Sequence, residues 1–301
     1  MNGVLILDKP GGLTSHDVVN RVRRILQERS VGHLGTLDPM ATGVLVVVTG
    51  SFTRLAQFYS FSEKAYEGEI RFGFATDTYD AEGEVTGQQQ VRLTMEQLTR
   101  MARKFTGLIE QMPPPFSAKK IQGVPAYRLA RKKQEVPLKP VQVEVKEFEI
   151  LHFAEDRARF RARVSSGTYL RSMAHDMGAQ LGCGAHLASL RRTESGEFQI
   201  AHAHTLEALE AAAKNDRLDD VLIHPRQILP QLPCVTADEQ AIAYIRNGRS
   251  VNLPEFSNAP MVKVFASQRD LIALATRVAG TLFHPKIVLA TGLKPDYATK
   301  E

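Results

Sequence analysis

The sequence predicts an α+β protein with two domains. Segments that read as strands and segments that read as helices alternate irregularly, whereas a doubly wound α/β fold repeats strict strand–helix–strand units. The 301 residues exceed what one hydrophobic core usually serves. The C-terminal part reads as several short strands, which is typical of a small β-barrel. We therefore expect a mixed, largely antiparallel sheet flanked by helices, followed by a small β-barrel-like domain.

The first predicted elements are a strand at residues 3–7 and a helix that follows the turn Lys9-Pro10-Gly11-Gly12. Thr14 is the expected N-cap of this helix, and Asp17, three residues later, is its capping-box partner. Apolar side chains then recur at helical spacing and predict the buried stripe of the helix: Val18, Val19, Val22, Ile25 and Leu26.

Further strands and helices follow from the spacing of apolar residues. Runs of apolar or alternating residues predict strands at 44–48, 66–74, 141–153 and 158–164. Residues 77–83 are polar and predict a turn. Helical spacing predicts helices at 168–181, 185–190 and 206–213.

Three prolines between residues 216 and 235 mark the expected domain boundary. We expect one domain at residues 1–228 and a second at 232–301. The second contains a predicted helix at 237–246, which ends at Asn247-Gly248. Its predicted strands are residues 262–265, 271–276 and 287–289.

The composition excludes several classes of protein. Apolar runs are strand-sized, so no segment is long enough to span a bilayer, and no basic leader precedes the first apolar run. A cytoplasmic location is therefore expected. Cys183 and Cys234 are far apart in the sequence, which argues against a disulfide framework and a zinc site and predicts reduced, buried thiols.

Positive charge is concentrated in one segment. The whole chain carries a net charge of only +5. Residues 118–140 contain seven lysine and arginine residues but one glutamate, together with Tyr127 and several glycine and proline residues. Such a run is often a solvated surface, but the aromatic residue and the turn formers favour a basic flap over a polyanion.

The most informative segment is residues 32–45, Gly-His-Leu-Gly-Thr-Leu-Asp-Pro-Met-Ala-Thr-Gly-Val-Leu. Gly35 and Gly43 permit unusual backbone angles, and Pro39 biases Asp38 toward an extended conformation. The segment therefore predicts a rigid loop that presents the carboxylate of Asp38. Taken alone, an Asp-Pro pair is more often only a turn.

This segment resembles the catalytic motif of the TruB family of pseudouridine synthases. Four more segments match that family in the same order, and residues 245–248 and 283–286 look like parts of a PUA-type RNA-binding domain. The four segments are Leu7–Ser15, Lys64-Ala65-Tyr66 leading to residues 76–83, Gln111–Lys120, and residues 167–171 leading to residues 181–187. The resemblance covers essentially the whole chain.

The resemblance implies a reaction and its catalytic residues. Asp38 matches the family's nucleophilic aspartate, Arg171 its active-site arginine, and Tyr66 the tyrosine that stacks on the flipped uracil. We expect Arg171 to pair with Asp38, because a guanidinium fork matches a carboxylate. Isomerisation of uridine to pseudouridine is an internal transfer, which implies neither a cofactor nor a metal.

The resemblance also implies how RNA is bound. His33 matches the histidine that occupies space vacated by the flipped base, and Tyr169 and Leu190 match residues that line the uracil pocket. Residues 118–140 correspond to the family's thumb insertion, in which Lys119 and Lys120 are expected to bind the substrate. The expected partner is the T arm of tRNA, whose target base must leave its stack.

Two other functions remain open at this point. The chain could be an RNA-binding or RNA-folding protein, or the catalytic subunit of a guide-RNA complex. The presence of Asp38, Tyr66 and Arg171 argues against a binder without activity. We expect a monomer without an obligatory protein partner, and we interpret Asp77 and Asp80 as turn residues rather than metal ligands.

Overall fold

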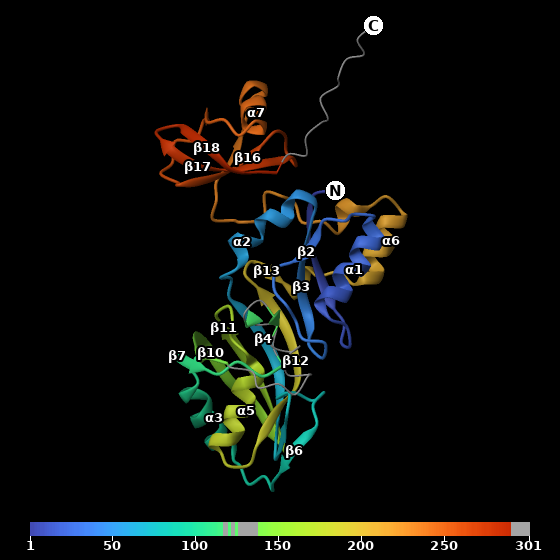
Figure 1. Ribbon diagram of the computed structural model, residues 1–301, viewed down its shortest axis with the longest axis vertical. Coiled ribbons are helices and arrows are strands. Elements are labelled where there is room, and N and C mark those ends of the chain that lie inside the picture. The colour runs from blue at the N-terminus through green and yellow to red at the C-terminus, as the bar shows by residue number, and fades with distance from the viewer. Residues whose placement is uncertain (117–119, 122–123, 126–137, 290–301) are drawn as a thin grey trace.

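The computed structural model describes residues 1–116, 120–121, 124–125 and 138–289. Figure 1 shows an elongated molecule, with a long sheet forming the body and a smaller C-terminal sheet at one end. The helices are α1 (Ser15–Leu26), α2 (Ala56–Tyr59), α3 (Met95–Lys104), α5 (Leu170–Gln180), α6 (Leu206–Lys214) and α7 (Glu239–Arg246).

The strands of the N-terminal part are β1 (Gly3–Lys9), β2 (Val31–His33), β3 (Thr42–Thr49), β4 (Lys64–Phe72), β5 (Phe74–Thr76), β6 (Val85–Gln88), β7 (Gly107–Gln111), β8 (Lys120–Ile121), β9 (Val124–Pro125), β10 (Val141–Ala154), β11 (Arg157–Val164), β12 (Ala185–Ser195) and β13 (Phe198–Gln199). Those of the C-terminal part are β14 (Cys234–Thr236), β15 (Val251–Asn252), β16 (Met261–Phe265), β17 (Leu271–Ala279) and β18 (Leu282–Val288).

Within the described residues, a nine-stranded sheet has the order β1-β3-β12-β4-β11-β10-β7, with β2 on β3 and β13 on β12. All its neighbours are antiparallel except β12 and β3, which are parallel. The α+β class with a mixed, largely antiparallel sheet is thus confirmed. In Figure 1, α1 and α6 lie against the β1–β3 part of the sheet, and α3 and α5 against the rest.

Helix α1 begins and packs as its sequence predicts. The Thr14 hydroxyl accepts a hydrogen bond from the Asp17 amide, and the Asp17 carboxylate accepts one from the Thr14 amide, which completes the capping box. Val18, Val19 and Val22 are buried in the core under the sheet. Ser15, the first residue of this helix, forms hydrogen bonds with the backbone of Leu37 in the loop that follows β2.

Residues 4–7 of β1 and 44–48 of β3 are all apolar because both faces of these strands are buried. Leu5, Leu7 and Leu45 belong to the core beneath the helices. Val4 and Val46 belong to a second core, which also contains residues of the C-terminal sheet. The two sheets therefore share a hydrophobic core, which holds the C-terminal part against this edge of the main sheet.

One predicted helix is wrong. Residues 185–190 lie in strand β12, between β4 and β3 near the middle of the main sheet. The register of β12 on β4 shifts between Leu187 and Ser189. A bulge adds one residue to a strand and interrupts its alternation, so the apolar residues Leu187 and Leu190 stand three apart, as in a helix. Pairing on both sides decides the conformation.

The C-terminal sheet contains β14, β16, β17, β18 and β15 in that order, with α7 packed against it. It is consistent with the expected PUA-like domain, and the predicted helix ends at Asn247-Gly248 as expected. The boundaries 1–228 and 232–301 stay predictions. In the described ranges, no helix is long and apolar enough to cross a membrane.

The two cysteines differ in environment, which corrects part of the sequence-based interpretation. Cys183 is a buried free thiol, as expected, but Cys234 is exposed. Cys234 is the first residue of β14, the strand at the edge of the C-terminal sheet. Cys234 and Thr236 project from the exposed face of β14, whereas Val235 projects from the opposite, buried face.

Candidate active site

The loop that carries Asp38 is held by backbone contacts on both of its sides. Lys9 Nζ donates hydrogen bonds to the carbonyl oxygens of Pro10, Leu13 and Pro39, at 2.9, 2.6 and 3.1 Å. The Ser15 hydroxyl accepts from the Leu37 amide at 2.8 Å and lies 3.1 Å from the Leu37 carbonyl oxygen. These contacts fix the residues on either side of Asp38.

Glycine is required where β3, the strand that follows this loop, pairs with β12. Gly43 has a φ of 98°, and a Cβ built on it would lie 2.2 Å from the Arg192 carbonyl oxygen. Gly35 has a φ of 137°. The Arg192 side chain donates hydrogen bonds to the carbonyl oxygens of Gly35, Thr36 and Val44. The loop is therefore rigid because Arg192 binds it from the sheet.

Arg171 lies between two carboxylates. Its Nη2 donates a hydrogen bond to Asp38 Oδ1 at 3.2 Å, and its Nε lies 2.9 Å from Asp38 Oδ2. On the other side, its Nη1 donates to Asp80 Oδ2 at 3.2 Å. The expected pairing of Arg171 with Asp38 is confirmed. Nη2 also donates to the Phe116 carbonyl oxygen at 2.9 Å.

The two carboxylates differ in exposure. The side chains of Arg171 and Asp80 are 5% and 6% exposed, whereas that of Asp38 is 36% exposed. Asp80 Oδ1 also accepts hydrogen bonds from the Thr78 hydroxyl at 2.6 Å and the Glu82 amide at 3.1 Å. Asp80 is thus the buried carboxylate that holds Arg171 in place, and Asp38 is the carboxylate that a ligand can reach.

Sequence reasoning placed Asp80 in a turn and missed this contact. The turn is correct, but the carboxylate of Asp80 points inward to Arg171. The match of residues 76–83 to the family motif was the available signal. A turn alone does not require an aspartate at this position, so a motif that includes Asp80 indicates a further role for its side chain. Lys9, Lys64 and Arg192 lie in matched segments or beside them and were missed in the same way.

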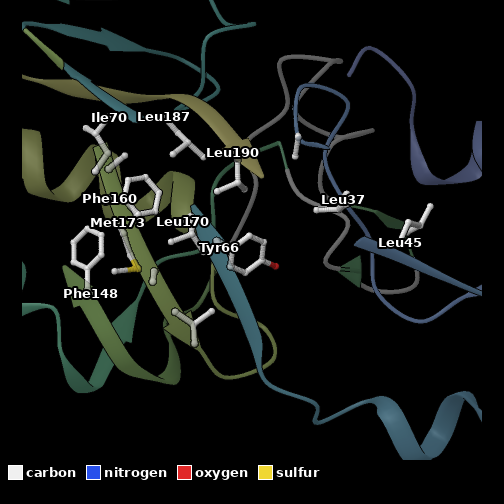
Figure 2. Packing of buried hydrophobic residues seen from close by; sticks show 14 of the residues in the cluster. Leu37, Leu45, Tyr66, Ile70, Phe148, Phe160, Leu170, Met173, Leu187 and Leu190 are labelled. Carbon is white, nitrogen blue, oxygen red and sulfur yellow. The ribbon is translucent and has the colours of Figure 1, made fainter. Parts of the chain in front are cut away.

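Asp38 opens into a cleft of about 530 Å³. The predicted site residues gather around it: His33, Asp38, Tyr66, Tyr169, Arg171 and Leu190 all line the cleft. Figure 2 shows Tyr66 and Leu190 on one side and Leu37 on the other, with the phenolic oxygen of Tyr66 pointing toward the Leu37 side. Aromatic and apolar side chains such as Tyr66, Tyr169 and Leu190 share this lining with the charged side chains of Asp38 and Arg171.

The position of Tyr169 is fixed by a glutamine. The Tyr169 amide donates to Gln111 Oε1 at 2.8 Å, and Gln111 Nε2 donates to the Tyr169 carbonyl oxygen at 2.9 Å. Tyr169 is the N-cap residue of α5, and Arg171 lies in the first turn of that helix. One pair of hydrogen bonds therefore orients both a wall residue and the arginine.

Electrostatics tune the groups in the cleft. Burial raises the pKa of Asp38, and the guanidinium of Arg171 opposes that rise. Burial lowers the pKa of His33, and the nearby charge of Arg192 lowers it further. Neutral imidazole is therefore favoured at His33, which fits a role in binding rather than in proton transfer.

Some expected residues cannot be placed. Lys119 and the side chain of Lys120 lie outside the described residues, as does most of the basic segment 118–140. Across the described ranges, no group of three or more histidine, cysteine, aspartate or glutamate side chains gathers in a way that could hold a metal ion.

Comparisons with known proteins assign the chain to a family. A profile described as "TruB family pseudouridylate synthase (N terminal domain)" matches residues 23–170, and one described as "tRNA pseudouridylate synthase B C-terminal domain" matches residues 171–230. The chain belongs to the TruB family. A relative from Solibacter usitatus (strain Ellin6076), named tRNA pseudouridine synthase B, is 50% identical over 96% of this chain and 100% of the relative.

More distant relatives agree. A TruB-family protein from Dehalococcoides mccartyi (strain ATCC BAA-2266 / KCTC 15142 / 195), also named tRNA pseudouridine synthase B, is 39% identical over 95% of each chain. A chain in a solved structure called "Crystal Structure of a Cbf5-Nop10-Gar1 Complex" has 26% identity and a TM-score of 0.70, covering 96% of this chain and 85% of that one. The TruB resemblance predicted from residues 32–45 is therefore confirmed.

Proposed function

We propose that this TruB-family chain isomerises one uridine in the T loop of tRNA to pseudouridine, with Asp38 as the nucleophile. The observation that carries the proposal is the ion pair of Asp38 with Arg171 at the base of a cleft that Tyr66 lines. A relative with 50% identity over nearly the full length, named tRNA pseudouridine synthase B, supports tRNA as the substrate.

The reaction needs a carboxylate and a closed space for one base. The bond between C1′ and N1 breaks, the base turns, and C1′ joins C5; C5 loses a proton and N1 gains one. No electron is gained or lost overall, so the isomerisation requires no redox partner. Asp38 supplies the covalent step, for which its carboxylate must be ionised.

Arg171 serves that requirement. Its guanidinium contacts both oxygens of Asp38 and itself is held by Asp80 and two carbonyl oxygens. A carboxylate that is held in this way keeps its charge and its direction although burial raises its pKa. The arginine thus stabilises an ionised nucleophile in a cleft where burial opposes ionisation.

The aromatic and apolar walls suit a flipped uracil. Tyr66 can stack on the base, and Leu190 and Tyr169 enclose it. After the new bond forms, a proton must leave C5, and the Tyr66 hydroxyl is our candidate to accept it. His33, which lines the same cleft, is proposed to fill the space that the base leaves in the RNA loop.

We further propose that the chain works as a cytoplasmic monomer without an obligatory protein partner. A single copy of the chain supplies the candidate residues Asp38, Tyr66 and Arg171. The substrate, tRNA, is a cytoplasmic molecule. Sedimentation equilibrium with and without a T-arm RNA would test the stoichiometry, and a specific activity that is independent of dilution would support a monomer.

The deciding experiment uses a T-arm stem-loop RNA whose single target uridine carries tritium at C5. Release of tritium into water reports the reaction, and fluorescence anisotropy of a labelled copy reports binding. We expect the wild type to release tritium without added metal or nucleotide. We expect Asp38→Asn to bind this RNA but to release none.

Asp77→Asn is the matched control, because Asp77 lies in the neighbouring turn, where its carboxylate accepts only from the Glu84 amide in the described structure. It should retain wild-type activity. If folded wild type binds the stem-loop and releases no tritium, the proposal fails, and a role in RNA folding or a requirement for a guide RNA takes its place.

A further inference from the structure

Two buried cations lie together in the wall of the cleft. Lys64 is the first residue of β4, and Arg192 lies opposite Tyr66 on the paired strand β12. The position that a Cβ on Gly35 would take is 3.6 Å from both Arg192 Nη1 and Lys64 Cε. Both side chains line the cleft. Lys64 and Arg192 are therefore neighbours on the face of the sheet that carries Tyr66.

Neither cation has a carboxylate partner among the described residues. Arg192 is 1% exposed and donates to carbonyl oxygens of the loop that presents Asp38. Lys64 is 9% exposed, and its ammonium donates to the Ser62 carbonyl oxygen at 2.6 Å. The charged group that acts on the pKa of Lys64 is Arg192, which has the same sign.

Lys9 provides a comparison from the same region. It too is buried, but its ammonium donates to three carbonyl oxygens and lies in the field of Asp38. An ammonium has three N–H donors, so Lys9 is saturated and holds the loop. Lys64, with one hydrogen bond in the described structure, keeps two donors for a ligand in the cleft.

A positive charge buried without a counter-ion destabilises a protein, so its burial calls for a gain elsewhere. The part of the cleft beside Lys64 therefore suits an anionic ligand. A hydroxyl or a carbonyl oxygen would satisfy one donor but would leave the charges of Lys64 and Arg192 uncompensated. A phosphate oxygen satisfies both the donors and the charge.

The geometry points to a backbone phosphate of the RNA, next to the flipped uridine, as the ligand of Lys64 backed by Arg192. This inference rests on the proposed function. Residues two apart on a strand project from the same face and lie about 7 Å apart. A nucleotide whose base stacks on Tyr66 therefore brings its backbone to Lys64.

Such a contact gives the enzyme a way to favour the flipped state. Extruding the base costs unstacking energy that contacts in the cleft must offset. A phosphate that reaches Lys64 only after the nucleotide enters the cleft contributes to that state and not to the initial encounter. Lys64 would then act on the bound RNA and differ from surface lysines, which act on association.

The test combines a protein variant with an RNA variant. In a series of stem-loops, one phosphate at a time near the target is replaced by a neutral methylphosphonate, with 2′-deoxyribose at that linkage. The reference for each is a stem-loop with the same 2′-deoxyribose and an ordinary phosphate. Dissociation constants are measured for wild type and for Lys64→Met, which keeps the length of the side chain but removes its charge. Asp38→Asn in both backgrounds prevents turnover.

We expect one methylphosphonate position to weaken binding by wild type about tenfold or more, the loss typical of a hydrogen bond to a charged group. Lys64→Met should weaken binding of the unmodified RNA by a similar factor and should lose nothing further at that position. Lys146→Met is the control, because Lys146 is an exposed lysine that pairs with Glu63 on the neighbouring surface. It should retain the full loss at the sensitive position.

Two results would overturn the inference. One is a wild type that tolerates neutralisation of every phosphate around the target, which needs no variant and so does not depend on the folding of Lys64→Met. The other is full additivity, in which the methylphosphonate weakens binding by Lys64→Met by the same factor as it weakens binding by the wild type. Tritium release by the wild type tests the proposed function independently, because the binding measurements use proteins that carry Asp38→Asn and cannot turn the RNA over.

Discussion

Arg171 contacts Asp38 and Asp80 with different edges of one guanidinium group. The edge toward Asp38 uses Nε and Nη2, at 2.9 and 3.2 Å, and Nη1 meets Asp80 at 3.2 Å. Asp38 comes from a loop after β2, Asp80 from a turn after β5, and Arg171 from α5. A planar fork can join three such distant segments, because its donors have fixed directions.

The fork therefore matters more than the charge, and Arg171→Lys should show it. Lysine keeps the positive charge but cannot contact both carboxylates with parallel donors. We expect kcat to fall about 100-fold, the order of effect that a misplaced catalytic group produces. KM for the stem-loop should change little. Single-turnover rates measured over a range of enzyme concentrations would separate the effect on the chemical step from the effect on RNA binding. A variant that retains full kcat would contradict this prediction.

Asp80 should act as a positioning residue. Asp80→Asn keeps the size of the side chain but removes the charge that holds Nη1 of Arg171, so we expect kcat to fall roughly 10- to 100-fold. RNA affinity should not change. Asp77→Asn, in the same turn, should retain full activity. Equal losses in the two variants would mean that the turn as a whole, and not the contact of Asp80 with Arg171, supports the reaction.

The pH dependence gives a second readout of this arrangement. Because burial raises the pKa of Asp38, the ionised nucleophile should be lost at a pH above the ordinary aspartate value of about 4. Arg171 opposes that rise, so Arg171→Met should move the acid limb of kcat/KM to higher pH. The measurement is tritium release under kcat/KM conditions over mildly acidic pH; an acid limb at lower pH in the variant would contradict the assignment.

The sequence predicted most elements and a set of residues that the fold gathers around one cleft, because motifs and caps are local signals. The capping box of Thr14 and Asp17, the loop of Asp38 and the pairing of Arg171 all follow from short segments. The helix predicted at 185–190 is wrong because its conformation depends on pairing with β4 and β3 across long sequence distances. No local periodicity carries that information.

The same reason explains why Asp80 and Lys64 were missed as site residues. Asp80 occupies a turn whose sequence requires only a polar residue, and Lys64 begins a strand where a lysine is ordinarily solvated. Only the fold brings Asp80 to Arg171 and Lys64 to Arg192. Residues whose role arises from burial cannot be recognised before the burial is known.

Gly43 should be among the positions least tolerant of substitution. Its φ of 98° disfavours any side chain, and the Cβ of Gly43→Ala would lie 2.2 Å from the Arg192 carbonyl oxygen. Backbone cannot move away as a flexible side chain can. We expect a loss in the free energy of unfolding of at least about 3 kcal/mol, combining backbone strain with displacement of β12.

Gly12→Ala is the control for that effect, because Gly12 has a φ of 81° but nothing within 4 Å of its would-be Cβ. It should cost only the strain, about 1 kcal/mol. Urea denaturation of both variants would give the comparison. Equal losses would show that positive φ accounts for the whole effect and that contact with Arg192 adds nothing.

A buried lysine retained for binding should reduce stability, and Lys64→Met should reveal that cost. Burial, and then the charge of Arg192, lower the pKa of Lys64 from 10.5 to about 8. Between these pH values Lys64 binds more protons in the unfolded chain than in the folded one. Its contribution to the free energy of unfolding of the wild type therefore rises with pH. Below pH 8 the penalty is present in full.

Methionine carries no such charge, so Lys64→Met should be at least as stable as wild type near pH 7 although it binds RNA less tightly. The difference in the free energy of unfolding should then narrow as the pH rises from about 8 toward 10.5. The pKa shifts of Lys9, Tyr59 and Tyr79 are common to both proteins and cancel in this difference. Urea denaturation at several pH values measures it. A variant that is much less stable than wild type at every pH would assign Lys64 to the structure, whereas a more stable and weaker-binding variant assigns it to the substrate.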